Sequence, residues 1–420
     1  MPANEIFAEK SIAVFPVSDD LLLPVLALLN STPISLLLDT FGRSRFIENS
    51  AIKRLPVGRN ELAALRPIER LTLDIVNIGR DDEALDETTT LFRGFALMYE
   101  EWATWSENAR GQVRLTQMDI DVAVSEALGV AVPVDDYDAR LDVFADSVVA
   151  RANPLDWSLR FVSYLAGIAF ERWEPKPLDQ DHVSEARLLF GPQAKTPPAA
   201  GDAFGVNEHQ PSSSDRVLVD EPGHVLDMVA HLEQAADRLP GGRLMLDRAV
   251  GVLGEKSLRA YVRRKLFKDH LARYSKSRRQ APVYWHLTIP SSTWSAWLYA
   301  PRFSREMLYA VLTLADHRLA VAADRIRALQ EDTGGSARQR AKAVDEERTL
   351  AVELKELRDD VARLAGIGWQ PDLDDGFVLC AAPLAKWFPR NTWRQLAETL
   401  AAIKVGDYPW SAVHKFRDAL

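Results

Sequence analysis

The chain has 420 residues, a formal net charge of −9, 26% charged residues and 47% hydrophobic residues. This length predicts two or three domains, and the composition is that of an ordinary globular protein rather than a disordered or fibrous one. The single cysteine, Cys380, excludes an intramolecular disulfide and a cysteine-based metal cluster, and it agrees with a reducing cytoplasm. The acidic balance argues against non-specific coating of nucleic acid.

The first 60 residues show no leader peptide and no clear membrane span. The first ten residues are mixed and charged, unlike a signal peptide, and prolines and polar residues interrupt the apolar run over 21–38. Residues 11–17 favour a short strand. A helix is predicted over 20–41, with acidic residues before it and Pro24 in its first turn. Residues 46–57 look extended.

Helical periodicity dominates the next part of the chain. It covers about residues 60–110, then residues 117–129 with Gly129 as the cap, then residues 157–173. Asn153 and Pro154 precede the last of these helices and are interpreted as its N-cap and first residue. Residues 191–215 are rich in proline, glycine and serine, which predicts a linker or mobile loop.

The charge of this acidic chain changes sign over residues 256–279, which hold ten basic residues and one acid, Asp269. Leu258, Val262, Leu266 and Leu271 recur at helical intervals, so the charges are predicted to line one side of a helix that continues into a loop at 275–280. A basic stripe in an acidic protein indicates a phosphate-binding surface. A solvated helix face is the alternative.

Strands are predicted over 283–289 and 293–299, joined as a hairpin at Pro290. Their tryptophans, Trp285, Trp294 and Trp297, could stack on bases, although burial in the sheet is the simpler interpretation. Two charged helices follow at about 304–332 and 337–365. The Gly-Gly-Ser sequence between them predicts an antiparallel helical hairpin.

Near the C-terminus, the sequence PDLDDG contains three aspartates that could bind a metal ion. An Asp-Gly turn before a strand, FVLC, is favoured instead. The acids concerned are Asp372, Asp374 and Asp375.

Motifs for several enzyme classes are missing from the sequence. There is no GxxxxGK[ST] phosphate loop, no HExxH, no GxSxG and no GxGxxG, and the eight histidines show no metal-ligand spacing. The sequence at 153–156, NPLD, lacks the second proline and the aromatic residue of an amino-methyltransferase turn. No catalytic, cofactor-binding or metal-binding residue is therefore assigned, and whether the chain is an enzyme is left open.

Several sequence blocks, in order, resemble the C-terminal target-recognition part of PglX-like adenine-specific DNA methyltransferases from phage-defence systems of the Pgl, BREX and DISARM type. The best block is FKDHLARYSKSRRQAPVYW. The others are SDDLLLPVLALLNSTPISLLL with FIENSAIKRLPV, FVSYLAGIAFERW, DEPGHVLDMVAHLE, WSAWLYAPRFSREMLY and WQPDLDDGFVLCAAPL. The catalytic half of the family is missing. Cys380 and Ala381 stand where relatives tend to have a polar residue.

The resemblance implies a DNA-binding specificity module of a restriction-modification or phage-defence enzyme. Its partners would be double-stranded DNA, a methyltransferase domain or subunit that carries S-adenosylmethionine, and other defence proteins, with no membrane. A naturally split subunit and an excised fragment both fit. The residues expected to contact phosphate are Arg263, Arg264, Lys268, Arg273, Lys276, Arg278 and Arg279. Tyr274 and Gln280 are expected to contact bases or sugars.

This interpretation requires that the basic side chains are not neutralised by carboxylates of the same chain. A protein-interaction subunit that does not itself bind DNA is the alternative, with the basic run pairing with an acidic partner. A stand-alone enzyme with an unrecognised site is a third possibility.

The expected fold is α+β and predominantly helical, with small mixed sheets or hairpins and a long antiparallel helical hairpin. Six segments are predicted. They are a target-recognition-like α/β start (1–60), a helical domain (61–190), a linker (191–222), a basic α/β DNA-contacting segment (223–302), a helical-hairpin spacer (303–366) and a tryptophan-rich C-terminal segment (367–420).

Overall fold

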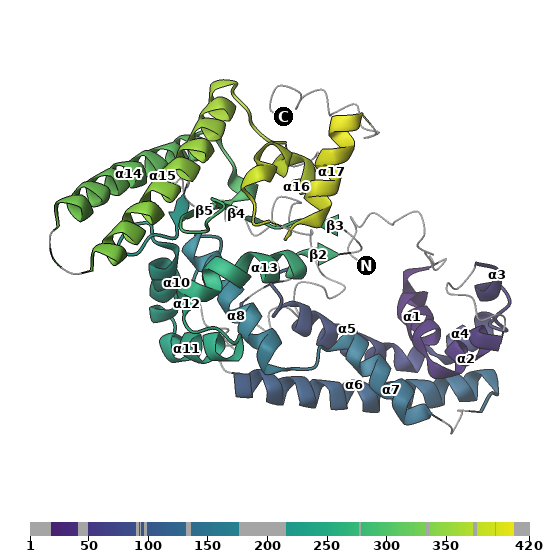
Figure 1. The fold of residues 1–420 in the computed structure, drawn as a ribbon. Coiled ribbons are helices and arrows are strands. Elements are labelled where there is room, and N and C mark those ends of the chain that lie inside the picture. Colours follow the sequence, from purple (N-terminus) through teal and green to yellow (C-terminus); the bar gives the residue numbers. More distant parts are fainter. Residues whose placement is uncertain are drawn as a thin grey trace. The chain divides into compact units, whose positions relative to one another are not determined.

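The computed structural model describes most of the chain (Figure 1). The described ranges are 18–40, 49–89, 92, 94–95, 99–131, 136–175, 216–276, 279–332, 334, 336–372, 376–390 and 392–406. The strand predicted over 11–17 and the linker predicted over 191–215 lie outside these residues. The chain divides into two compact units, Met1–Trp157 with Pro177–Phe204, and Ser158–Lys176 with Gly205–Leu420.

Helices build the first unit. They are α1 (Leu22–Asn30), α2 (Thr32–Thr40), α3 (Asn49–Ile52), α4 (Arg59–Ala64), α5 (Glu69–Glu83), α6 (Tyr99–Leu128) and α7 (Tyr137–Val148), with short 3₁₀ turns at Asp19–Leu21 and Arg66–Ile68. Their core includes Ile34, Leu65, Val113 and Val124, which are fully buried. Burial of these apolar side chains is the main stabilising contribution to the unit.

The single helix predicted over 20–41 is wrong, because two helices occupy this stretch. Ser31 is extended (φ −74°, ψ 148°) and its hydroxyl donates to Leu28 O at 2.7 Å, which ends α1. Pro33 has no N–H with which to continue the hydrogen bonds of α1, whereas in the first turn of α2 that N–H is not needed. The buried carboxylate of Asp121 on α6 then accepts a hydrogen bond from Thr32 N at 2.9 Å at the start of α2.

Three other expectations for this unit need correction. The helical stretch predicted over about 60–110 is interrupted, because α5 ends at Glu83 and α6 begins at Tyr99. Residues 46–57 are not extended throughout, since α3 lies within them. The helix predicted over 117–129 is the end of the 30-residue α6 and not a separate element. The cap is confirmed, because Gly129 has φ +62°, a conformation that glycine adopts at little cost.

No single helix among the described residues is both long and apolar enough to cross a membrane. The pair α1 and α2 meets that test only when both helices are counted together, and the two are bent at 63° to each other.

The boundary between the units falls within α8 (Pro154–Ala169), whose predicted N-cap is confirmed. Asn153 Oδ1 accepts a hydrogen bond from Asp156 N at 2.8 Å, and Pro154 is the first helical residue. The sequence at 153–156 is thus explained as a helix start.

The second unit contains a three-stranded antiparallel sheet in the order β1-β5-β4. The strands are β1 (Val217–Val219), β4 (Tyr284–Thr288) and β5 (Ser295–Tyr299). The predicted hairpin is confirmed, with Trp285 opposite Leu298 and His286 opposite Trp297. Trp285, Trp294 and Trp297 are at most 1% exposed, so they are core residues and cannot stack on bases.

Helices surround this sheet. They are α10 (Met228–Asp237), α11 (Gly242–Val252), α12 (Leu258–Tyr261), α13 (Phe267–Arg273), α14 (Arg305–Glu331), α15 (Ala337–Gly366), α16 (Phe377–Ala381) and α17 (Arg394–Val405), with 3₁₀ turns at Ala300–Arg302 and Ala382–Trp387. The predicted helical hairpin is confirmed as α14 and α15, which lie side by side (Figure 1). The predominantly helical fold class is confirmed as well.

The predicted FVLC strand is wrong, because these residues form the short helix α16. Gly376 precedes the helix with φ +91°, and Cys380 N donates to Gly376 O at 3.1 Å. Cys380 is fully buried and its Sγ lies 2.9 Å from Asp372 O. Asp374 and Asp375 are outside the described residues, and no group of three or more metal-ligating side chains occurs among the described ones.

Candidate nucleic-acid interface

The basic segment folds as predicted from its apolar residues. Ser257 Oγ caps α12 by accepting a hydrogen bond from Ala260 N at 3.2 Å. A π-helical turn, η4 (Val262–Leu266), joins α12 to α13. The residues that hold this helix against the unit are buried, namely Leu258, Val262, Leu266 and Leu271. The basic side chains are thereby distributed over the remaining faces.

Two arginines in the first half of the segment pair with buried aspartates. Arg259 contacts both Asp220 and Asp227, with Nη2 2.6 Å from Asp227 Oδ2, and Arg263 Nε also donates to Asp220. The side chains of Asp220 and Asp227 are only 1% and 4% exposed. Burial alone would lower the pKa of Arg259, but the hydrogen bonds that it donates to Asp227 and Asp220 raise its pKa above the ordinary value.

The next two cations share one carboxylate. Glu255, 6% exposed, pairs with Arg264 and with Lys265 Nζ at 3.4 Å. Lys265 Nζ also donates to Leu253 O at 2.9 Å. Burial would raise the pKa of Glu255, but hydrogen bonds from Lys265 and Arg264 hold it below its ordinary range.

Arg263 and Arg264 therefore differ from the expectation of unpaired phosphate-binding cations. Their partners are remote in sequence, since Asp220 lies 43 residues before Arg263 and Glu255 lies 9 residues before Arg264. A charge count over residues 256–279 includes neither acid. The pairs fix the helix to the sheet and to the turn after α11, which is a structural role.

Lys268 and Arg273 occupy the second half of the helix. Lys268 is exposed, whereas Arg273 is half-buried and lines a small cavity with Tyr261 and Asp269. Tyr261 donates to Asp269 Oδ2 at 3.0 Å, and burial raises the pKa of Asp269. Of these two predicted phosphate ligands, Lys268 is the one placed openly at the surface.

Tyr274 and Gln280 anchor the end of the segment. The hydroxyl of Tyr274 accepts a hydrogen bond from Arg172, and its ring centroid lies 4.5 Å from that of the buried His270. Gln280 N donates to Gln395 Oε1 at 3.1 Å, and its own Oε1 is buried without a hydrogen-bond partner among the described residues. The Tyr274 hydroxyl is engaged within the protein and Gln280 Oε1 is buried, so neither side chain is placed as an open base contact.

The loop predicted at 275–280 is a small antiparallel hairpin of β2 (Ser275–Lys276) and β3 (Arg279–Gln280). Its register pairs Ser275 with Gln280 and Lys276 with Arg279. Ala281 N donates to Tyr274 O at 3.1 Å and closes the base of the hairpin. Arg278 and the side chains of Lys276 and Arg279 lie outside the described part of the structure.

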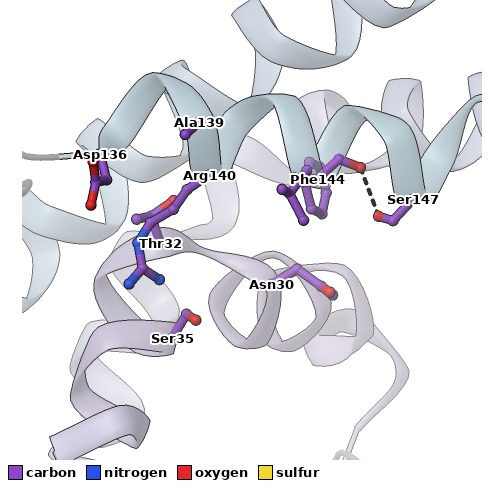
Figure 2. A pocket seen from close by; sticks show the side chains of 9 residues that line it. Asn30, Thr32, Ser35, Asp136, Ala139, Arg140, Phe144 and Ser147 are labelled. Carbon is purple, nitrogen blue, oxygen red and sulfur yellow. Dashed lines mark hydrogen bonds between the residues drawn. The ribbon is translucent and has the colours of Figure 1, made fainter. Parts of the chain in front are cut away.

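The first unit has an open pocket of about 510 Å³ between α7 and the α1–α2 bend (Figure 2). Arg140 and Phe144 of α7 face Asn30 and Ser35 across it. Ser147 Oγ donates to Phe144 O at 2.6 Å, and Arg140 lies 3.8 Å from Asp39. The residues that line this pocket include one carboxylate, Asp136, and three hydroxyl side chains, Thr32, Ser35 and Ser147, but no histidine, lysine or cysteine.

Comparison with known protein families and with curated proteins finds no match to this chain.

The sequence did not reveal the three carboxylates that organise the basic segment, Asp220, Asp227 and Glu255. Asp220 and Asp227 did carry a weak signal, since one follows a β-branched strand and the other precedes a helical pattern.

Proposed function

We propose that this chain binds duplex DNA through the β2–β3 hairpin and the exposed Lys268. It would serve as the DNA-reading part of an adenine-specific methyltransferase in a phage-defence system. Methyl transfer is assigned to a methyltransferase domain with S-adenosylmethionine, on another subunit or another part of the protein. The family assignment rests on the ordered sequence blocks. The DNA contact rests on the geometry of the hairpin.

The observation that carries the DNA contact is the register of Lys276 opposite Arg279. Like charges at directly opposed positions of an antiparallel pair repel each other, and a polyanion bound at such positions would relieve that repulsion. A two-stranded β-ribbon also has the size that the major groove of DNA admits. In the sequence, Arg278 adds a third basic residue between Lys276 and Arg279.

The rest of the segment supports the hairpin. The pairs of Arg259 and Arg263 with Asp220 hold the helix on the sheet, and Tyr274 and Gln280 fix the hairpin base. A binding element mounted on a rigid base loses less conformational freedom on binding. Contacts to phosphate set the register of the protein on the duplex, while the methylating enzyme extrudes its adenine at a cost of about a few kcal/mol.

The test is charge reversal in the hairpin, with Lys276→Glu and Arg279→Glu together. Anisotropy titrations of a labelled duplex between about 50 and 200 mM salt should show weaker binding. The slope of log K against log [salt] should become shallower by about one unit per lost contact.

The matched control is Lys342→Glu with Arg348→Glu, which makes the same change of net charge on the exposed surface of α15. This control should leave the slope unchanged. Equal effects of the two variants would mean that net charge alone governs binding. Co-purification with a methyltransferase subunit without any affinity for DNA would instead identify a protein-interaction subunit.

A further inference from the structure

Helix α6 carries an apolar stripe on the side opposite its buried face. Leu115, Met118 and Val122 follow one another at spacings of three and four residues, so they lie on one side of the helix. They are 66%, 38% and 50% exposed. Gly111 continues the stripe by one turn, and a side chain there would meet nothing within 4 Å. The helix therefore presents apolar residues on two faces, and the first unit covers only one of them.

The surface around this stripe is acidic. Helix α6 itself contains six acidic residues and two arginines. Both arginines are paired within the unit, Arg110 with Asp146 and with Glu107, and Arg114 with Asp138 and Asp142. Acids that flank the stripe are exposed, namely Glu107, Asp119 and Glu126. An apolar stripe with an acidic rim is complementary to an amphipathic segment with a basic rim.

We propose that this face of α6 is a docking site for a basic amphipathic helix of a partner protein. Apolar residues of that helix cover Leu115, Met118 and Val122, and its lysines or arginines pair with the acidic rim. The small Gly111 permits close approach of the partner helix at one end of the stripe. DNA is excluded as the occupant, because the rim repels phosphate.

The proposal can be tested on the full chain with a synthetic helical peptide of leucine and lysine, measured by calorimetry. We expect saturable binding that weakens with salt. Replacement of the stripe by Leu115→Gln, Met118→Gln and Val122→Gln should reduce affinity by about tenfold or more, because three apolar contacts are lost. Neutralisation of the rim by Glu107→Gln, Asp119→Asn and Glu126→Gln should flatten the salt dependence.

The matched control is Leu244→Gln with Val252→Gln, which removes exposed apolar residues from α11 and should not change peptide affinity. The same peptide with glutamate in place of lysine should not bind. Equal binding of both peptides, or full affinity of the glutamine stripe variant, overturns the proposal. The proposal would also be overturned if the wild-type chain did not bind the peptide but formed a dimer that the stripe variant could not form. The stripe would then bind a second copy of the chain. None of these measurements involves DNA, so their failure is separate from failure of the proposed DNA contact.

Discussion

Asp220 accepts a hydrogen bond from Arg259, and the side chain of this aspartate is only 1% exposed. The aspartate directly follows β1, and the arginine lies in the first turn of α12. Arg263 contacts the other carboxylate oxygen of Asp220. One buried acid thus joins the edge of the sheet to two turns of the basic helix.

Asp220→Asn should destabilise the protein by about 2–4 kcal/mol, because it leaves two arginines without their shared carboxylate. This loss of stability is expected to be smaller than for a fully buried ion pair, because the side chains of Arg259 and Arg263 are 23% and 35% exposed. Urea unfolding measures the change. Asp237→Asn is the control, because its ion pair with Arg243 is on the surface and contributes at most about 1 kcal/mol. Equal effects of the two variants would contradict the structural role of Asp220.

His286 should make stability depend on pH. Burial lowers its pKa to about 3 from 6.5, and neither ring nitrogen has a hydrogen-bond partner among the described residues. The unfolded chain therefore binds a proton first as pH falls below 6.5. Stability should decline from there toward pH 3 by up to about 1.4 kcal/mol per pH unit from this residue. Burial lowers the pKa of His270 as well, which adds a decline of the same sign.

In the protein the rings of His286 and Trp297 are stacked, with their centroids 4.0 Å apart. The variant His286→Phe should flatten the pH dependence of stability, because phenylalanine retains a ring at this place but cannot bind a proton. Thermal unfolding measured between about pH 4 and 7, where histidine titrates, gives the dependence of stability on pH directly. His317→Phe, at an exposed position of α14, is the control. An unchanged slope in His286→Phe would show that the decline arises elsewhere.

A buried ion pair sets the register of α14 against α15. Arg318 Nη2 lies 2.9 Å from Glu347 Oε2, and the two side chains are 11% and 9% exposed. Glu347→Leu alone should cost about 3–5 kcal/mol, since it leaves Arg318 buried without its partner. The double variant with Arg318→Met should recover most of the loss in chemical denaturation. Failure to recover would mean that packing, and not the unpaired charge, causes the defect.

The cap of α8 should contribute about 1 kcal/mol, because Asn153 satisfies the N–H of Asp156. Asn153→Ala should lose this amount, whereas Asn153→Asp should retain it. Ser336→Ala provides the comparison, since Ser336 occupies the N-cap of α15 without a side-chain hydrogen bond. Thermal unfolding of the three variants measures the difference. A loss in Ser336→Ala as large as in Asn153→Ala would argue against the hydrogen bond as the cause.

Local patterns predicted the elements whose signals lie within a few residues. Periodicity identified α14 and α15, the sheet hairpin followed from alternation around Pro290, and Asn153 was recognised as a cap. Local propensity failed where tertiary packing or a single residue decides. Pro33 divides one predicted helix into two, and α16 forms where valine and leucine favoured a strand.

The candidate interface could be predicted only in part, because charge balance depends on contacts between distant residues. The sequence located the basic segment and its helical half. It could not indicate that Asp220 and Glu255 neutralise the first half, since neither lies in a pattern that points toward an arginine. The pairing of Arg263 and Arg264 with these acids, and the register of Lys276 opposite Arg279, became known only from the fold.

The antiparallel pair of α14 and α15 allows length to vary without changing its base. Helix α14 has 27 residues, so it is about 40 Å long, and the Arg318–Glu347 pair lies within the rod. Whole turns removed in matched numbers from both helices beyond that pair would shorten the rod and leave its attachment as it is. Homologues are therefore expected to tolerate paired insertions and deletions at this tip, so that evolution could adjust how far the projection extends.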